Sequence, residues 1–244
     1  MSSTEPGPPA SAWPLWPLAL LAGLLPLVAT VVATTLSMQQ GLVPTCNPFW
    51  DGCTSISRAA RHDLPNHLFR ALMLPAATLQ AVVWLLTARW LLQCGAVGRG
   101  VAWIAPLGVV AGIALVVYGS FLGTEGPMYR WLRQYGTVAY FGFTCLNLLL
   151  TGNAVQALVR AGRLRMPRAL ECAMVTLATT LVLLGLGNAI VAAAFGEPLK
   201  GRVENVTEWW GALIFVLGFV ALALMWRRER VVLSLSSLLG VSPR

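Results

Sequence analysis

The stretch GVAWIAPLGVVAGIALVVYGSFLGT, residues 100–124, runs for 25 residues without a single Asp, Glu, Lys or Arg. An α-helix needs about 20 apolar residues to cross the hydrocarbon core of a bilayer, so this stretch is long enough to span one. Five further charge-free runs of at least 18 residues cover residues 6–50, 71–88, 134–159, 172–196 and 209–226. Prolines interrupt the start of the first run, and Gln39-Gln40-Gly41 closes it, so it holds one helix. The sequence therefore predicts six transmembrane helices.

The expected architecture is an all-α integral membrane bundle. Lipid offers no partner to backbone N–H and C=O groups, which leaves helices and closed barrels as spanning structures. Barrel strands alternate apolar and polar residues, whereas these runs are apolar all round. Only 11% of residues are charged, against about 25% in soluble domains, and the mean hydropathy is +0.71. The expected helices cover residues 15–38, 67–92, 101–122, 134–159, 169–195 and 207–226.

Three segments are expected along the chain. Residues 1–14, rich in Pro and Ser and without Lys or Arg, are predicted to be a disordered leader. They are not predicted to begin a cleaved signal peptide, because the apolar segment after them exceeds the roughly 15 residues of a signal core. Residues 15–226 form the six-helix domain, whose one long connection is 39–66. Residues 227–244 form a basic, amphipathic tail that is expected to lie on the inner leaflet.

The distribution of basic residues predicts the orientation, because Lys and Arg favour the cytoplasmic side. The side that holds both termini carries ten basic residues against three acidic ones, and the other side carries seven against six. Both termini are therefore expected in the cytoplasm, with 39–66 outside. The Ala-, Leu- and Arg-rich composition is typical of a high-GC bacterium, so the inner membrane is the expected location. The sequence has no basic segment interleaved with aromatic residues, so we do not expect it to bind nucleic acid.

Polar side chains within the expected helices fall on defined faces. Such residues are costly in lipid and usually face the bundle interior. They recur at helical spacing as Thr30, Thr34 and Ser37, as Gln80, Trp84 and Thr87, and as Tyr140, Thr144, Asn147 and Thr151, while Asn188 stands alone. Either interhelical hydrogen bonds or a polar cavity for a lipid headgroup would explain them. On the third helix Gly108, Gly112, Gly119 and Gly123 form two small-xxx-small pairs, which predict close helix packing.

The stretch CTSISRAARHDLPNHLFR, residues 53–70, holds both histidines of the chain. Two histidines are too few for a three-histidine zinc site, although a mixed site with Asp63 or a cysteine fits the ligand types. Ser55 and Ser57 lie near His62 without forming a known catalytic motif. We therefore predict no metal, no cofactor and no assigned catalytic residue.

Glu208 opens the sixth expected helix at its outer end. It is expected either to form a capping box with Asn205 or to pair with Arg70 or His67 at the same membrane depth.

The cysteines divide into two groups. Cys46 and Cys53 lie seven residues apart in the outer loop. They are candidates for a disulfide in an oxidising compartment, with two free thiols as the alternative. Cys94, Cys145 and Cys172 are expected to be packing residues.

Several of these residues resemble a known family. The Ser55-Ile56-Ser57 end of the loop, Pro65, Phe69-Arg70, the segment QYGTVAYFGF at 134–143 and Glu208-Trp209 before IFVLGF are similar to the Frag/DRAM/Sfk family of six-helix membrane proteins. The sequence departs from that family at Arg58, where an aspartate is common. The resemblance implies a six-helix fold and an association with membrane lipids.

The leading functional hypothesis is a non-enzymatic protein that binds or organises membrane lipids through an outer-leaflet groove. The competing hypotheses are a lipid acyltransferase or hydrolase with His62 or His67 as base, and a scaffolding subunit with a membrane-protein partner. The candidate headgroup site consists of His62, Asp63, His67, Arg70, Asn188 and Glu208.

Overall fold

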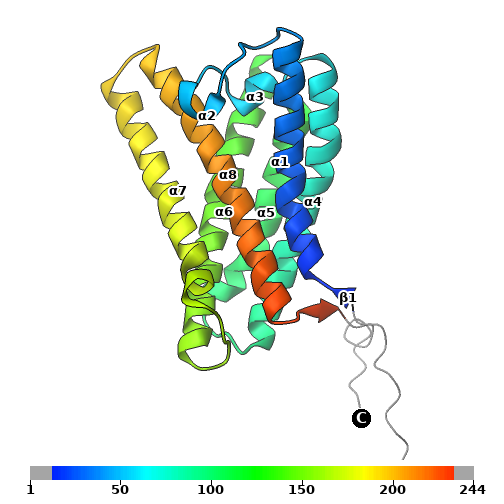
Figure 1. Cartoon of the computed structure of the whole chain (residues 1–244), viewed down its shortest axis with the longest axis vertical. Helices are drawn as coiled ribbons and strands as arrows, with labels where there is room; N and C mark the ends of the chain where they lie inside the picture. Colours follow the sequence, from blue (N-terminus) through cyan, green and yellow to red (C-terminus); the bar gives the residue numbers. More distant parts are fainter. Residues whose placement is uncertain (1–12, 234–244) are drawn as a thin grey trace, which may run out of the picture.

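Six long helices form a closed ring in the computed structural model, which describes residues 13–233 (Figure 1). Each helix packs against its two neighbours in the order α1, α4, α5, α6, α7, α8 and back to α1. Their bounds are α1 Trp16–Gln39, α4 Asp63–Gln93, α5 Arg99–Phe121, α6 Pro127–Arg160, α7 Arg168–Ala194 and α8 Leu199–Arg228. All six are long and apolar enough to cross a bilayer, which confirms a multi-pass helical membrane protein.

Two short helices lie in the connection between α1 and α4. In α2, Pro48–Asp51, the side chain of Asn47 caps the first turn by accepting a hydrogen bond from the Phe49 N–H at 3.1 Å. In α3, Ile56–Ala59, the Ser55 hydroxyl does the same for the Arg58 N–H at 3.1 Å. Such caps satisfy donors that a helix start leaves free. We refer to the end of the bundle with this connection as the loop-bearing end.

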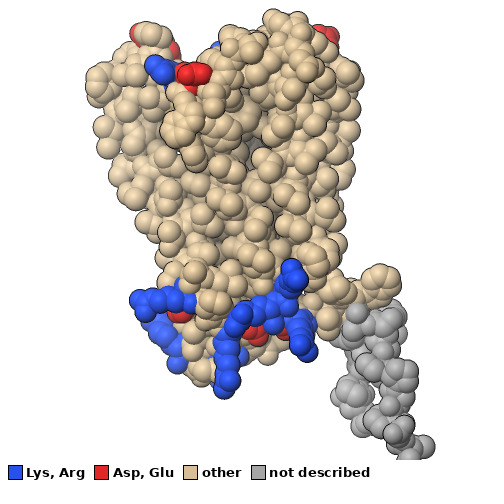
Figure 2. Space-filling model, in the orientation of Figure 1, with Lys and Arg blue, Asp and Glu red and all other residues tan. Residues whose placement is uncertain are grey.

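At the opposite end the chain closes on itself. Strand β1, Trp13–Pro14, pairs antiparallel with β2, Val232–Leu233. Most of the expected leader 1–14 and the larger part of the expected tail 227–244 lie outside the described residues. Arginines gather at this end, around the end of α8, and form the basic band in Figure 2.

Three helices begin four or more residues earlier than the sequence predicts. They are α4, α6 and α8, which start at residues 63, 127 and 199 instead of 67, 134 and 207. The sequence prediction placed the start of each helix after the last charged residue. The helices in fact begin in the headgroup layer, where charged side chains are hydrated. The 34 residues of α6 span about 51 Å at 1.5 Å per residue, well beyond a hydrocarbon core of about 30 Å.

The expected polar faces point into the ring, as predicted. Thr144, Asn147 and Thr151 on α6 are fully buried, and their side-chain polar atoms have no hydrogen-bond partner among residues 13–233. The Gln80 amide of α4 donates to the carbonyl of Ala22 in α1 at 2.9 Å. Interhelical hydrogen bonding therefore accounts for part of the polar set but not for the stripe on α6.

Three of the four predicted glycines, Gly108, Gly112 and Gly119, pack α5 against α4, which confirms close helix packing, whereas Gly123 lies beyond the end of α5. A Cβ added at Gly108 would overlap the Trp84 side chain, and one added at Gly112 would lie 2.9 Å from the Cβ of Ala81. Small residues let the two backbones approach closely.

Candidate functional site

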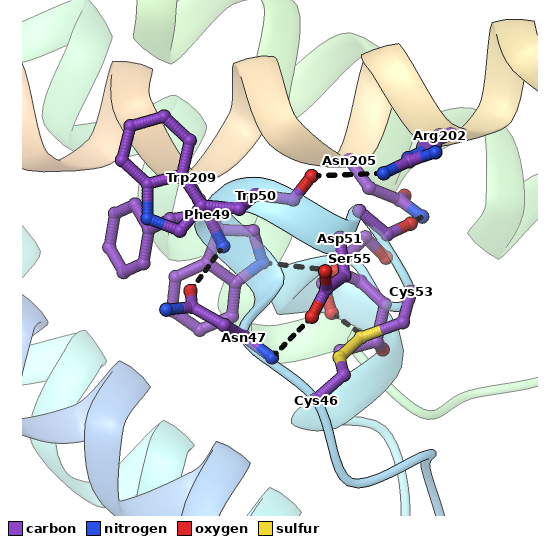
Figure 3. The surroundings of a disulfide bond; sticks show 12 residues. Cys46, Asn47, Phe49, Trp50, Asp51, Cys53, Ser55, Arg202, Asn205 and Trp209 are labelled. Carbon is purple, nitrogen blue, oxygen red and sulfur yellow. Dashed lines mark hydrogen bonds between the residues drawn. A yellow bond between two sulfur atoms is a disulfide. The ribbon is translucent and has the colours of Figure 1, made fainter.

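A disulfide-closed loop covers one side of α8 at the loop-bearing end (Figure 3). Cys46 and Cys53 are bonded to each other, with Cα atoms 6.6 Å apart. Within the loop, the Asn47 N–H donates to the Asp51 carboxylate at 2.9 Å. The short segment is therefore closed by a covalent bond and by its own hydrogen bonds. We call residues 46–53 the disulfide loop.

Side chains of α8 hold this loop and the residue that follows it. The Asn205 amide donates to the Gly52 carbonyl at 2.7 Å. The indole N–H of Trp209 donates to Thr54 at 3.0 Å, and that of Trp210 donates to Phe49 at 3.2 Å. The Phe49 ring lies 5.3 Å from that of Trp209. One face of α8 is thus a platform for the loop.

Glu208 lies between this platform and the interior of the ring. One of its carboxylate oxygens accepts a hydrogen bond from the Ser57 N–H at 3.3 Å. The predicted capping box is wrong, because α8 begins at Leu199 and both Asn205 and Glu208 lie inside the helix. Neither Arg70 nor His67 forms an ion pair with Glu208. Equal membrane depth did not bring these residues together, because α1 lies between α4 and α8 in the ring.

The interior of the ring contains a cavity of about 180 Å³. Five of the six long helices line it, together with Phe49 of α2 and Ile56 of α3, and α7 contributes no residue. Its wall is largely apolar, with polar groups from Gln80, Tyr118, Tyr140 and Glu208. We call it the interior cavity.

A larger space of about 1000 Å³ opens between α6, α7 and α8 and reaches the loop-bearing end. Its deeper walls are apolar and include Val138, Leu181 and Phe215. Its mouth is charged and polar, with side chains of Arg61, Arg130, Arg133, Asn188, Glu204 and Glu208. We call it the lateral groove.

The lateral groove exists because α7 packs loosely. Only 11% of the residues in the apolar core segment of α7 are buried within the protein, against 61% in α8. In Figure 1, α7 leans away from α6 toward the loop-bearing end, while it runs beside α8. A helix that exposes so much apolar surface in a membrane protein faces lipid, so the groove is open to the side.

The structure brings together only two of the residues predicted for a headgroup site. Glu208 and Asn188 both line the lateral groove. The other four line neither the groove nor the interior cavity, and they are the exposed His62, Asp63 and His67 and the half-buried Arg70.

The arginines of the groove were missed by sequence reasoning. Arg130 and Arg133 are three residues apart and share a face of α6, a spacing that the sequence shows. The shared face was not recognised from the sequence, because the expected helix began at residue 134, after both arginines, whereas α6 begins at Pro127.

In the described part of the chain, the candidate catalytic and metal-ligating side chains are not gathered into one site. Within residues 13–233, no three His, Cys, Asp or Glu side chains lie close enough to hold a metal ion. The hydroxyls of Ser55 and Ser57 lie 3.2 Å apart and bond to each other. Neither histidine is part of a hydrogen-bonded nucleophile and base in the described chain.

No family model, curated protein or solved structure matches the chain. The segment Ser55-Ile56-Ser57 and the pair Glu208-Trp209 meet in space, since the Ser57 N–H donates to the Glu208 carboxylate.

Proposed function

We propose that this membrane protein binds a phospholipid in the lateral groove, in the leaflet at the loop-bearing end. The observation that supports it most is the combination of apolar walls, a charged mouth and an opening beside α7. From Arg130 to Cys145 the groove follows α6 for about 22 Å at 1.5 Å per residue. That exceeds half of a hydrocarbon core of about 30 Å, so one acyl chain fits along it.

Two glycines of α7 provide a matched test. A Cβ at Gly185 or at Gly187 would meet nothing within 4 Å, so a leucine fits at either position. Only Gly185 lines the lateral groove. We expect Gly185→Leu to lower the phospholipid that copurifies with the protein severalfold and Gly187→Leu to leave it unchanged, as measured by native mass spectrometry with lipidomics. Equal amounts of copurifying phospholipid in both variants would contradict the proposal. Wild-type protein without bound phospholipid would also contradict it, and this is the result expected of a purely scaffolding protein.

The same proposal places both termini in the cytoplasm and the protein in a bacterial inner membrane. The basic band at the end where α8 finishes supports this orientation (Figure 2). A cysteine that replaces the exposed Ala161, in a variant without the free cysteines Cys94, Cys145 and Cys172, should resist an impermeant thiol reagent in intact cells. Labelling of that cysteine would reverse the orientation.

Membership of the Frag/DRAM/Sfk family is part of the proposal and agrees with a lipid-associated role. A binding or organising role is preferred to an acyltransferase or hydrolase, because both histidines are exposed away from the groove.

A further inference from the structure

The mouth of the lateral groove has two chemically different walls. The loop and α6 supply Arg61, Arg130 and Arg133. Arg133 donates to the Phe121 carbonyl at 3.0 Å, which orients its guanidinium. Arg61 and Arg130 make no side-chain hydrogen bond or ion pair with residues 13–233. This wall therefore offers several N–H donors to an anion.

The wall made by α7 and α8 offers acceptors. Glu208 receives a backbone hydrogen bond from Ser57 and forms no ion pair with the described residues, although Arg58 lies close enough to interact with it electrostatically. The side-chain oxygen of Asn188 is buried without a hydrogen-bond partner. Glu204 differs, because Lys200 already lies 4.0 Å from it. Buried acceptors without donors are unfavourable, so a bound cationic donor would stabilise this wall.

Both walls face the same space. Arg61 and Arg133 on one wall and Glu208 on the other line the same groove, and so does the Tyr118 side chain. An anion and a cation held together in one headgroup can therefore reach both walls at once.

We propose that the lipid class bound in the groove is an aminophospholipid such as phosphatidylethanolamine, an inference that rests on the proposed lipid-binding function. The phosphate accepts hydrogen bonds from the arginines, and the ammonium donates to Glu208 and Asn188. A primary ammonium carries three N–H donors. The quaternary ammonium of phosphatidylcholine carries none, and the headgroup of phosphatidylglycerol carries no cation.

The test compares retention of three lipids with identical acyl chains by purified protein in native mass spectrometry. Wild-type protein should retain phosphatidylethanolamine about tenfold better than phosphatidylcholine or phosphatidylglycerol, the size expected for one charge-assisted hydrogen bond. Glu208→Gln should remove this preference, because glutamine still accepts from Ser57 but carries no charge. Asp63→Asn is the matched control, since Asp63 is an exposed acid at the same end that does not line the groove, and it should keep the preference.

Arg130→Gln tests the arginine wall, because the Arg130 side chain has no hydrogen bond to lose. Arg70→Gln is the control, because Arg70 does not line the groove. Only the first should weaken retention of all three phospholipids. Unfolding temperatures of all variants identify any loss that comes from misfolding. Equal retention of the three lipids by wild type, or a preference that survives Glu208→Gln, would overturn the headgroup assignment and leave lipid binding intact. Retention of none of them would remove the proposed function and this inference together.

Discussion

The two flanks of α8 at the loop-bearing end are built in opposite ways. On one flank the disulfide loop lies against the helix, and Asn205, Trp209 and Trp210 each donate a hydrogen bond to a carbonyl of residues 49–54. On the other flank α7 leans away from α6, the lateral groove opens between them, and the side-chain oxygen of Asn188 is buried without a partner among the described residues. The chain satisfies its own polar groups on the first flank and leaves polar groups free on the second.

This difference separates structure from binding. Where intramolecular partners already satisfy each donor, a ligand gains little by competing with them. Where polar groups line an open space without partners, a ligand can supply the missing hydrogen bonds. We therefore expect substitutions on the loop flank to change stability and substitutions on the groove flank to change what is bound.

The largest effect is expected from Trp209→Ala on the loop flank. Trp209 is 5% exposed and contacts Phe49, so its removal should lower the free energy of unfolding by about 3–5 kcal/mol. Phe195→Ala, at the residue that follows the end of α7 and is 54% exposed, should cost about 0.5 kcal/mol or less. Reversible unfolding in mixed micelles measures both. Similar losses would mean that the two flanks do not differ in packing.

A smaller effect is expected from opening the disulfide. Cys46→Ser should cost about 2–3 kcal/mol, because the bond restricts a short loop in the unfolded chain. Cys172→Ser, at a half-buried free cysteine, should cost less. Mass mapping without reductant checks the bond directly, and two alkylatable thiols at positions 46 and 53 in native protein would rule it out.

The smallest effect is expected from a double-mutant cycle between Arg70 and Glu208. Because the two residues form no ion pair in the structure, the losses from Arg70→Ala and Glu208→Ala should add to within about 0.5 kcal/mol. A coupling energy well above this value would show that Arg70 and Glu208 interact, as their membrane depth suggested. The charged site would then include α4 instead of the α7 flank.

The sequence predicted the features that the bilayer imposes. Charge-free runs such as 100–124 must be helical, because lipid leaves backbone groups no other partner. The interior faces of Gln80 and Asn147 also followed from the sequence, since polar side chains avoid lipid. Helix starts were harder, because charged residues are tolerated once a helix enters the headgroup layer, and Arg130, Arg133 and Asn205 consequently fell outside the predicted helices.

Tertiary structure alone decided which residues meet. Arg61 and Arg133 are far apart in sequence, and their convergence with Glu208 and Asn188 depends on the order of helices around the ring and on the tilt of α7. Composition and periodicity show which face of a helix is buried, but they do not show which helix lies beside it. Side-chain packing selects the neighbours, so α1 separates Arg70 from Glu208 while the loose packing of α7 opens the groove.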